Sequence, residues 1–182
     1  PPVLAKRLAQ AIDNARVMAI EGNVHPLAQV QYDQGKVESS FPLNPMTLVF
    51  KPDPNQQAEL DTLLKQLHDP SSRNYHKWLT PEQFGNRFGL GQDDLNRVIG
   101  WLQSQGFTIE GVARSKSWIT FSGRASHVEA TFKTEIHRYS TAGVTNYANA
   151  RNPSVPVALT DVVLGFRGFN NFRPKPRGVF RR

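Results

Sequence analysis

The sequence predicts a mixed α+β fold, because runs with the composition of strands alternate with runs that carry apolar residues at helical spacing. The order is strand, helix, a loop with a short helix, helix, two strands, helix and strand. This order is typical of a split βαβ arrangement, so we expect a ferredoxin-like antiparallel sandwich with helices on one sheet face. We expect an N-terminal arm at 1–44, this domain at 45–172 and a disordered basic tail at 173–182.

Strong local signals bound the first elements of the domain. The run MTLVFK is rich in β-branched and aromatic residues and stops at a proline, as strands do. The sequence DPNQ at 53–56 is a capping box with proline at the first helical position, and its helix should end before Pro70. TPEQ at 80–83 repeats this box and predicts a short helix. A third helix should begin near Gln92 and end at Gly106.

The second half begins with two strands, FTIEGVA and SWITFSG, and a helix follows them. EIHRYS and VTNYAN have the pattern of a further hairpin, and VVLGFRGF is the last strand. Successive strand residues point to opposite faces. We therefore expect Ile119 and Phe121 to face the helices, and Trp118 and Thr120 to face away from them.

The sheet face that points away from the helices is the candidate partner-docking surface. Strand alternation assigns four side chains to it: Trp118, Thr120, His137 and Tyr139. Aromatic side chains on an open face of this kind mark an interaction site. The alternative is that the N-terminal arm covers this face.

The N-terminal arm has two parts. The first places apolar side chains at helical spacing: Leu4, Leu8, Ala11, Ile12, Ala15 and Met18. The second part is interrupted by prolines and extended. We expect it to have few partners within the domain.

The stretch SSRNYHKWLTPEQFGNRFG is irregular yet strongly aromatic, whereas surface loops are usually polar. We expect Trp78, Phe84 and Phe88 to pack over the two long helices and to close the core. Tyr75 and His76 should lie near the edge of that core. Burial of one such ring stabilises the fold by roughly 1.5–3 kcal/mol.

The net charge of +7 lies almost entirely at the C-terminal end, and the preceding chain is close to neutral. No acidic residue follows Asp161, and the basic residues after it are Arg167, Arg173, Lys175, Arg177, Arg181 and Arg182. One interpretation is a solvated basic tail. The other is a segment that occupies an acidic groove of a partner.

Residue content excludes several classes of chemistry. The absence of Cys excludes disulfides, thiolate zinc sites and Cys nucleophiles. No His-Glu-x-x-His helix, phosphate loop or Gly-x-Ser-x-Gly elbow occurs, so we expect no catalytic residue, metal or cofactor in this chain. No apolar run approaches the roughly 20 residues of a membrane helix.

An RNA-binding domain is disfavoured because Trp118 and Phe121 lie on opposite strand faces. A stand-alone interaction module remains an alternative.

Several long stretches resemble the activation domain of sedolisin-type, kumamolisin-like serine-carboxyl peptidases. They are LLKQLHDPSSRNYHKWLTPEQFGNRFG from Leu63, the helix end WLQSQGF, SWITFSGRASHVEATFKTEIHRY, YANARNPSVP and VVLGFRGF. The resemblance covers residues 24–172. It implies the N-terminal propeptide of a secreted or periplasmic, acid-active endopeptidase, with the signal peptide absent from this chain.

The resemblance also implies a partner and a mechanism. The domain would act as tethered inhibitor and folding chaperone of a catalytic domain, until self-cleavage at low pH. The catalytic residues, and any calcium site, would belong to that peptidase domain. The sheet would dock on it, and a linker would run through its cleft with Arg173, Lys175, Arg177, Phe180, Arg181 and Arg182.

Three histidines are candidates for pH sensing. Histidine gains charge between about pH 7 and 5, which is the range in which an acid-activated propeptide would be released. The candidates are His68, His76 and His137, and the alternative is that each is simply solvated.

Overall fold

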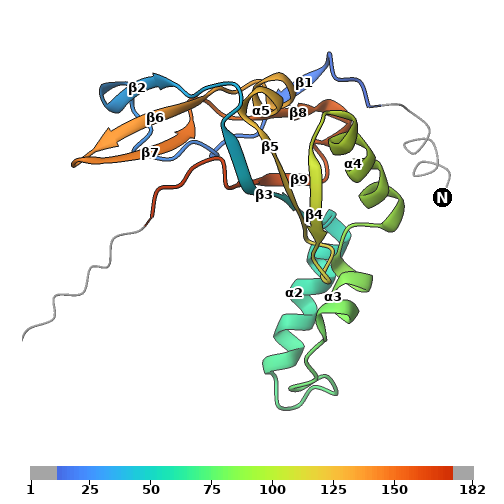
Figure 1. The fold of residues 1–182 in the computed structure, drawn as a ribbon. Helices are drawn as coiled ribbons and strands as arrows, with labels where there is room; N and C mark the ends of the chain where they lie inside the picture. The colour runs from blue at the N-terminus through green and yellow to red at the C-terminus, as the bar shows by residue number, and fades with distance from the viewer. Residues whose placement is uncertain (1–11, 174–182) are drawn as a thin grey trace, which may run out of the picture.

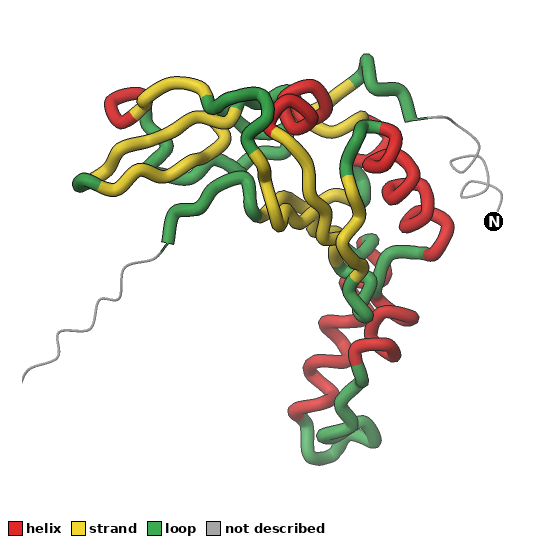
Figure 2. The backbone as a smooth tube through the Cα atoms, viewed as in Figure 1, coloured by secondary structure: helices red, strands yellow, loops and turns green. Residues whose placement is uncertain are grey.

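The computed structural model describes residues 12–173. Over this range the chain forms nine strands, four α-helices and two 3₁₀ turns, η1 (Val30–Tyr32) and η2 (Val157–Leu159). A body of sheets carries a helical projection at one end (Figures 1 and 2). The α+β class predicted from the sequence is therefore confirmed.

The central sheet has four strands: β3 (Pro42–Phe50), β4 (Thr108–Val112), β5 (Trp118–Arg124) and β9 (Val163–Arg167). Their order is β4-β5-β3-β9, and every neighbouring pair is antiparallel. All four strand regions were predicted from their composition.

Helices α4 (Gln92–Ser104) and α5 (Ala125–Phe132) pack on one face of this sheet, and their apolar side chains form the main core with it. Trp101 of α4 meets Phe132 of α5 edge to face, with the ring centroids 5.8 Å apart. Asp93 and Asp94 lie in the first turn of α4, where the helix dipole favours acidic side chains.

Helices α2 (Pro54–His68) and α3 (Pro81–Phe88) form a stalk that projects from the sheet (Figure 1). Each begins with the predicted capping box. Their apolar side chains pack in a second, separate cluster: Leu63, Leu67 and Phe88, with Leu60, Leu79 and Phe84 against them. The expectation that the first long helix covers the central sheet is therefore wrong.

The base of the stalk is fixed against the turn between β4 and β5. A Cβ atom at Gly85 would lie 2.5 Å from the carbonyl oxygen of Arg114, and one at Gly89 would lie 2.5 Å from that of Ser115. Only glycine permits so close an approach of two backbones. An ion pair between Arg114 and Glu82, 3.0 Å long, lies beside this contact.

A three-stranded antiparallel sheet extends the body in the order β2-β6-β7. Its strands are β2 (Asp33–Lys36), β6 (Ile136–Thr141) and β7 (Val144–Asn149). The predicted hairpin between β6 and β7 is confirmed. Its turn has positive φ at Ala142 and Gly143, as tight hairpins require.

The described part of the N-terminal arm belongs to the fold, so the expectation of few internal partners is wrong. Strand β1 (Val17–Ala19) pairs with β8 (Ser154–Pro156), and β2 pairs with β6. Met18 thus lies in a strand and not in the expected helix, while Leu4, Leu8 and Ala11 lie outside the described residues. The division placed at 44/45 falls inside β3.

Asn23 bonds this arm to two distant parts of the chain, residues 149–152 and β9. Its backbone N–H donates to the side chain of Asn152 over 3.0 Å, and its side-chain oxygen accepts from Phe166 N–H over 2.8 Å. The fully buried Asn149 donates from Nδ2 to the Asn23 carbonyl over 2.8 Å. These hydrogen bonds, which include the buried Nδ2 of Asn149, hold the arm in one arrangement against the rest of the chain.

Candidate partner-docking surfaces

The face of the central sheet that points away from α4 and α5 is called the outer face here. Ile119 and Phe121 of β5 are fully buried, whereas Trp118 is 44% exposed and Thr120 is partly exposed. The predicted alternation along this strand is confirmed. The sheet therefore leaves Trp118 and Thr120 on its uncovered side.

Strand register extends the outer face across three strands. Thr47 of β3 lies opposite both Thr120 and Arg167, so these three residues form one row. Val49 lies opposite Trp118 in the next row. The outer face thus combines an exposed indole and a valine with hydroxyl groups and one cation, a mixture found at protein interfaces.

The other two predicted docking residues lie elsewhere. His137 and Tyr139 belong to β6, in the sheet β2-β6-β7. Tyr139 is only 2% exposed, so the expectation of an open face that carries both Trp118 and Tyr139 is wrong. Burial, and secondarily the charge of Asp33, raises the pKa of the Tyr139 phenol.

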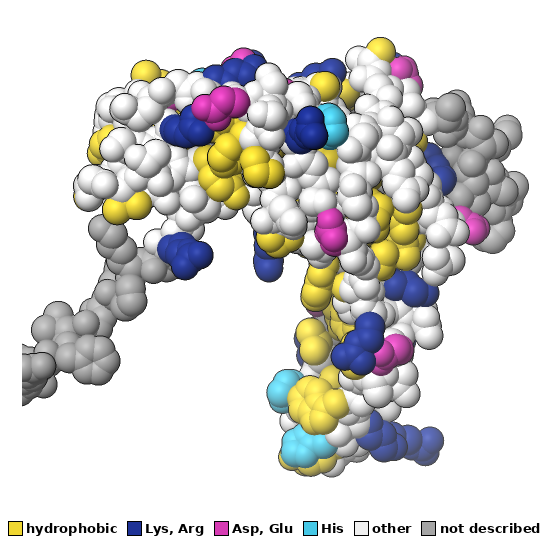
Figure 3. Space-filling view, viewed as in Figure 1, with side chains coloured by type: hydrophobic (Ala, Val, Ile, Leu, Met, Phe, Trp, Pro, Cys, Tyr) yellow, Lys and Arg dark blue, Asp and Glu magenta, His cyan; other side chains and the backbone are white. Residues whose placement is uncertain are grey.

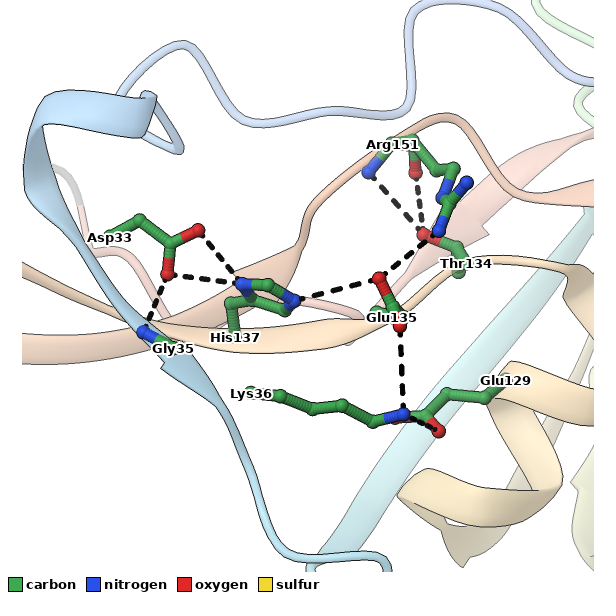
Figure 4. A network of polar contacts seen from close by, with 8 residues as sticks. All are labelled: Asp33, Gly35, Lys36, Glu129, Thr134, Glu135, His137 and Arg151. Atoms are coloured by element: carbon green, nitrogen blue, oxygen red, sulfur yellow. Dashed lines mark hydrogen bonds and ion pairs between the residues drawn. The ribbon is translucent and has the colours of Figure 1, made fainter.

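His137 joins β6 to the N-terminal arm. Its Nδ1 donates to the Asp33 carboxylate, with distances of 2.8 Å and 3.0 Å to the two oxygens. Asp33 also accepts from Gly35 N–H over 2.7 Å. The other ring nitrogen of His137 is buried and lies 3.8 Å from Glu135, so the imidazole sits between two carboxylates (Figure 4).

Glu135 continues this polar network to α5 and to the segment after β7 (Figure 4). One carboxylate oxygen lies 3.0 Å from Arg151, and the other lies 3.6 Å from Lys36. Lys36 also pairs with Glu129 of α5 over 2.7 Å. Partial burial acts to raise the pKa of Glu135, but Lys36 and Arg151 outweigh it and hold that pKa below its ordinary value.

Sequence reasoning identified His137 but missed the acidic and basic residues around it. The one available signal was that Glu135 and His137 are two residues apart and so share a strand face. Asp33 and Lys36 lie about a hundred positions away in the chain. No local pattern pairs residues at that separation.

The aromatic loop lies at the free end of the stalk, and it does not close the main core. Phe88 is buried and Phe84 is partly buried, but they pack between α2 and α3 and not over the two long helices as expected. Trp78 is 60% exposed, so its predicted burial is wrong. His68 and His76 are exposed beside it: the ring centroids lie 5.7 Å and 6.2 Å from that of Trp78.

The basic linker begins at a fixed point. Phe172 stacks on His25, with the ring centroids 4.2 Å apart and the planes 8° from parallel. Arg173 follows and is exposed. The remaining predicted linker residues lie outside the described part of the chain: Lys175, Arg177, Phe180, Arg181 and Arg182.

Within residues 12–173, no three His, Asp or Glu side chains converge as metal ligands would. No helix in this range is long and apolar enough to cross a membrane. The described residues form an α+β domain with exposed aromatic side chains at Trp118, Trp78 and Tyr75.

Comparison with known proteins gives the family. Residues 31–172 match the family model described as "Pro-kumamolisin, activation domain", and the chain belongs to this family. It is 34% identical over 164 residues to xanthomonalisin of a Xanthomonas strain, which covers 90% of this chain and 17% of that protein. It is 29% identical over 115 residues to sedolisin of a Pseudomonas strain, covering 63% of this chain and 20% of that protein.

A third relative is tripeptidyl-peptidase sed1 of Aspergillus fumigatus, 30% identical over 92 residues, which are 48% of this chain and 14% of that protein. The chain thus spans a fifth or less of each of these relatives. The family is that of propeptide domains of sedolisin-type serine-carboxyl peptidases, as the sequence resemblance implied.

Proposed function

We propose that this chain is the propeptide of a sedolisin-type serine-carboxyl endopeptidase, which it helps to fold and holds inactive until self-cleavage at low pH. The family match over residues 31–172 is the observation that carries this proposal. We place the precursor outside the cytoplasm, secreted or periplasmic. The catalytic groups belong to the peptidase domain, so this chain by itself hydrolyses no peptide.

We assign the central sheet with α4 and α5 to the ferredoxin-like class. The order β4-β5-β3-β9 with antiparallel neighbours supports this assignment, because a split βαβ unit places its first and third strands at the centre. In this class the two helices lie on one face, which leaves the other free for a partner. The stalk is then an insertion between the first two strands of the unit.

The outer face is the primary docking surface in this proposal. Trp118 and Val49 supply apolar area, while Thr47, Thr120 and Arg167 supply hydrogen-bond donors that orient the partner. A partly exposed tryptophan at a protein interface is a typical hot spot of binding energy. Trp118→Ala should therefore weaken binding about tenfold or more.

The basic linker then enters the substrate cleft of the peptidase. It leaves the domain at Phe172, which is held by His25, so the linker starts from a defined position. Its excess of Arg and Lys complements a cleft rich in carboxylates, and the attraction fades as those carboxylates take up protons. Removal of residues 173–182 should raise the inhibition constant.

Acid would release the propeptide from the peptidase domain through the protonation of carboxylates more than through a charge gained by the histidines. A charge gained by His137 is compensated by Asp33 and Glu135 on either side, so protonation of this imidazole does not by itself break the contact. Protonation of Glu135 removes the charge that pairs with Lys36 and Arg151. His68 and His76 stay candidates for sensing at the stalk.

The decisive experiment mixes the purified chain with the mature peptidase domain of the same precursor. We expect inhibition near pH 7 and its loss near pH 4. Val144 is an exposed valine in the sheet β2-β6-β7, so Val144→Ala is the control for Trp118→Ala. Absence of inhibition at pH 7, or peptide hydrolysis by the chain alone, contradicts the proposal.

A further inference from the structure

The free end of the stalk, called the stalk tip here, exposes apolar side chains that the fold does not use. It comprises the last turns of α2 and the loop to α3, residues 64–79. Trp78 is 60% exposed, Leu64 45% and Tyr75 38%. Figure 3 shows apolar and His side chains gathered at this end, with Lys or Arg beside them.

The rings of the stalk tip are stacked on one another. Tyr75 stacks on His76 with centroids 3.8 Å apart, and His76 lies nearly parallel to Trp78 at 6.2 Å. His68 of α2 meets the Trp78 ring edge to face. The stack holds the rings in position and leaves Trp78 and Tyr75 exposed to solvent.

The loop backbone is held in one conformation by local hydrogen bonds. His76 N–H donates to the carbonyl of Leu67 over 3.1 Å, and Asn74 donates from Nδ2 to Gln66 over 2.7 Å. Asp69 accepts from the backbone and hydroxyl of Ser71. A rigid loop with exposed aromatic rings loses little conformational entropy on binding, which is a property of good binding surfaces.

His76 adds backbone strain to this arrangement. Its φ of +55° is in the left-handed region, which costs a non-glycine residue about 1–2 kcal/mol. The conformation aligns the His76 ring between the other two. Strain of this kind at an exposed site points to a function outside the stability of the fold.

The charge of the stalk tip specifies the chemistry of its partner. Lys65, Arg73 and Lys77 are exposed, and within residues 12–173 none of them forms an ion pair. The single acidic residue of the stalk tip is Asp69. An aromatic surface surrounded by cations complements an apolar patch bordered by carboxylates.

We propose that the stalk tip is a second docking site, and that it binds an acidic, partly apolar patch on the same peptidase domain that the outer face contacts. The inference rests on the proposed function. Two links support a common partner: the turn that precedes Trp118 packs on Gly85 and Gly89 of α3, and β3 leads directly into α2. The stalk is therefore fixed relative to the outer face, so one partner contacts both in this proposal.

The test measures association and dissociation rates of the full chain with the peptidase domain at pH 7. Trp78→Ala should raise the dissociation rate about tenfold, because aromatic anchors dominate interface energies. Lys77→Glu should slow association several-fold, and added salt should reduce that difference. Val30→Ala, a change at a 92% exposed valine far from the stalk, is the control and should leave both rates unchanged.

The possible outcomes separate the two proposals. If both stalk variants bind like the parent chain while Trp118→Ala binds more weakly, the second site is wrong and the proposed function stands. If the unmodified chain binds no peptidase, both are wrong. If Trp78→Ala instead abolishes binding to vesicles of anionic phospholipid and leaves peptidase binding unchanged, the stalk tip contacts a membrane surface, and the proposal is overturned.

Discussion

The Nδ1 atom of His137 lies 2.8 Å from the Asp33 carboxylate, and this contact joins two residues that are 104 positions apart. It fixes β2 of the N-terminal arm against β6. Both side chains are largely buried, so the interaction is shielded from solvent more than a surface ion pair would be. The arm is therefore a structural part of the domain.

Loss of this contact should lower stability measurably. Asp33→Asn removes the charge and one acceptor, and a hydrogen bond to a charged group contributes about 1.5–3 kcal/mol. We expect the melting temperature to fall by several degrees. Asp61→Asn, which changes an exposed carboxylate on α2 that accepts from Gln57 Nε2 in the preceding turn, is the control and should change the melting temperature little. Equal melting temperatures for both variants would contradict this role of Asp33.

The network around Glu135 should make the domain less stable in acid. The pKa of Glu135 is lower in the folded chain than in the unfolded chain, so the unfolded state takes up protons first. The stabilisation is thus complete above the ordinary pKa of about 4.3 and is lost as pH falls through the folded value. Arg138 likewise lowers the pKa of Glu38 through a hydrogen bond, so this pair also loses stabilisation as the pH falls.

Glu135→Gln tests this pH dependence. The variant cannot lose a proton, so its stability should fall less steeply than that of the parent chain between about pH 5 and 3. The measurement is chemical denaturation monitored by circular dichroism across this range. Glu110→Gln is the matched control, because Glu110 lies outside the network. If the stability of Glu135→Gln fell more steeply with decreasing pH than that of the parent chain, the predicted pH dependence would be wrong.

The two clusters of rings should respond differently to truncation. Phe88 is 3% exposed between α2 and α3, so Phe88→Ala should destabilise the protein by about 3–5 kcal/mol. Trp78→Ala removes a ring that is mostly in solvent and should cost less than about 1 kcal/mol. Thermal unfolding of both variants gives the comparison. A large loss for Trp78→Ala would mean that its ring stabilises the stalk.

Because α3 lies so close to the β4–β5 turn, the addition of a single methyl group should change the stability of the protein. Gly85→Ala places a Cβ against the Arg114 carbonyl, so one of the two backbones must shift, at a cost of about 1–3 kcal/mol. Gly100→Ala, in the middle of α4 with open space around it, should stabilise by about 0.5–1 kcal/mol. Stability changes of the same sign in both variants would contradict the close packing of α3 on the β4–β5 turn.

Local patterns predicted the elements of this fold because each signal acts over a few residues. The capping boxes at Asp53 and Thr80 close between positions three residues apart, and both are present. The alternation along β5 follows from the geometry of one strand, and it placed Ile119 and Trp118 on the correct faces. The family resemblance likewise came from continuous stretches of sequence.

Long-range packing could not be predicted in the same way. The apolar stripe of α2 showed that this helix buries one face, but the same stripe can pack on a sheet or on α3. The outcome depends on Gly85 and Gly89, which bring α3 to the β4–β5 turn and leave Trp78 at a free end. The burial of Tyr139 follows from sheet assembly that no local pattern encodes.

The sequence by itself determined the α+β class, the helix starts, the two faces of β5 and the family. The tertiary structure alone decided that the arm is bonded into the sheets, that the first long helix belongs to a stalk, and that His137 faces two carboxylates. The physical reason is that capping and alternation depend on neighbouring residues. Sheet order, helix placement and ion-pair networks depend on contacts between residues that are up to 143 positions apart.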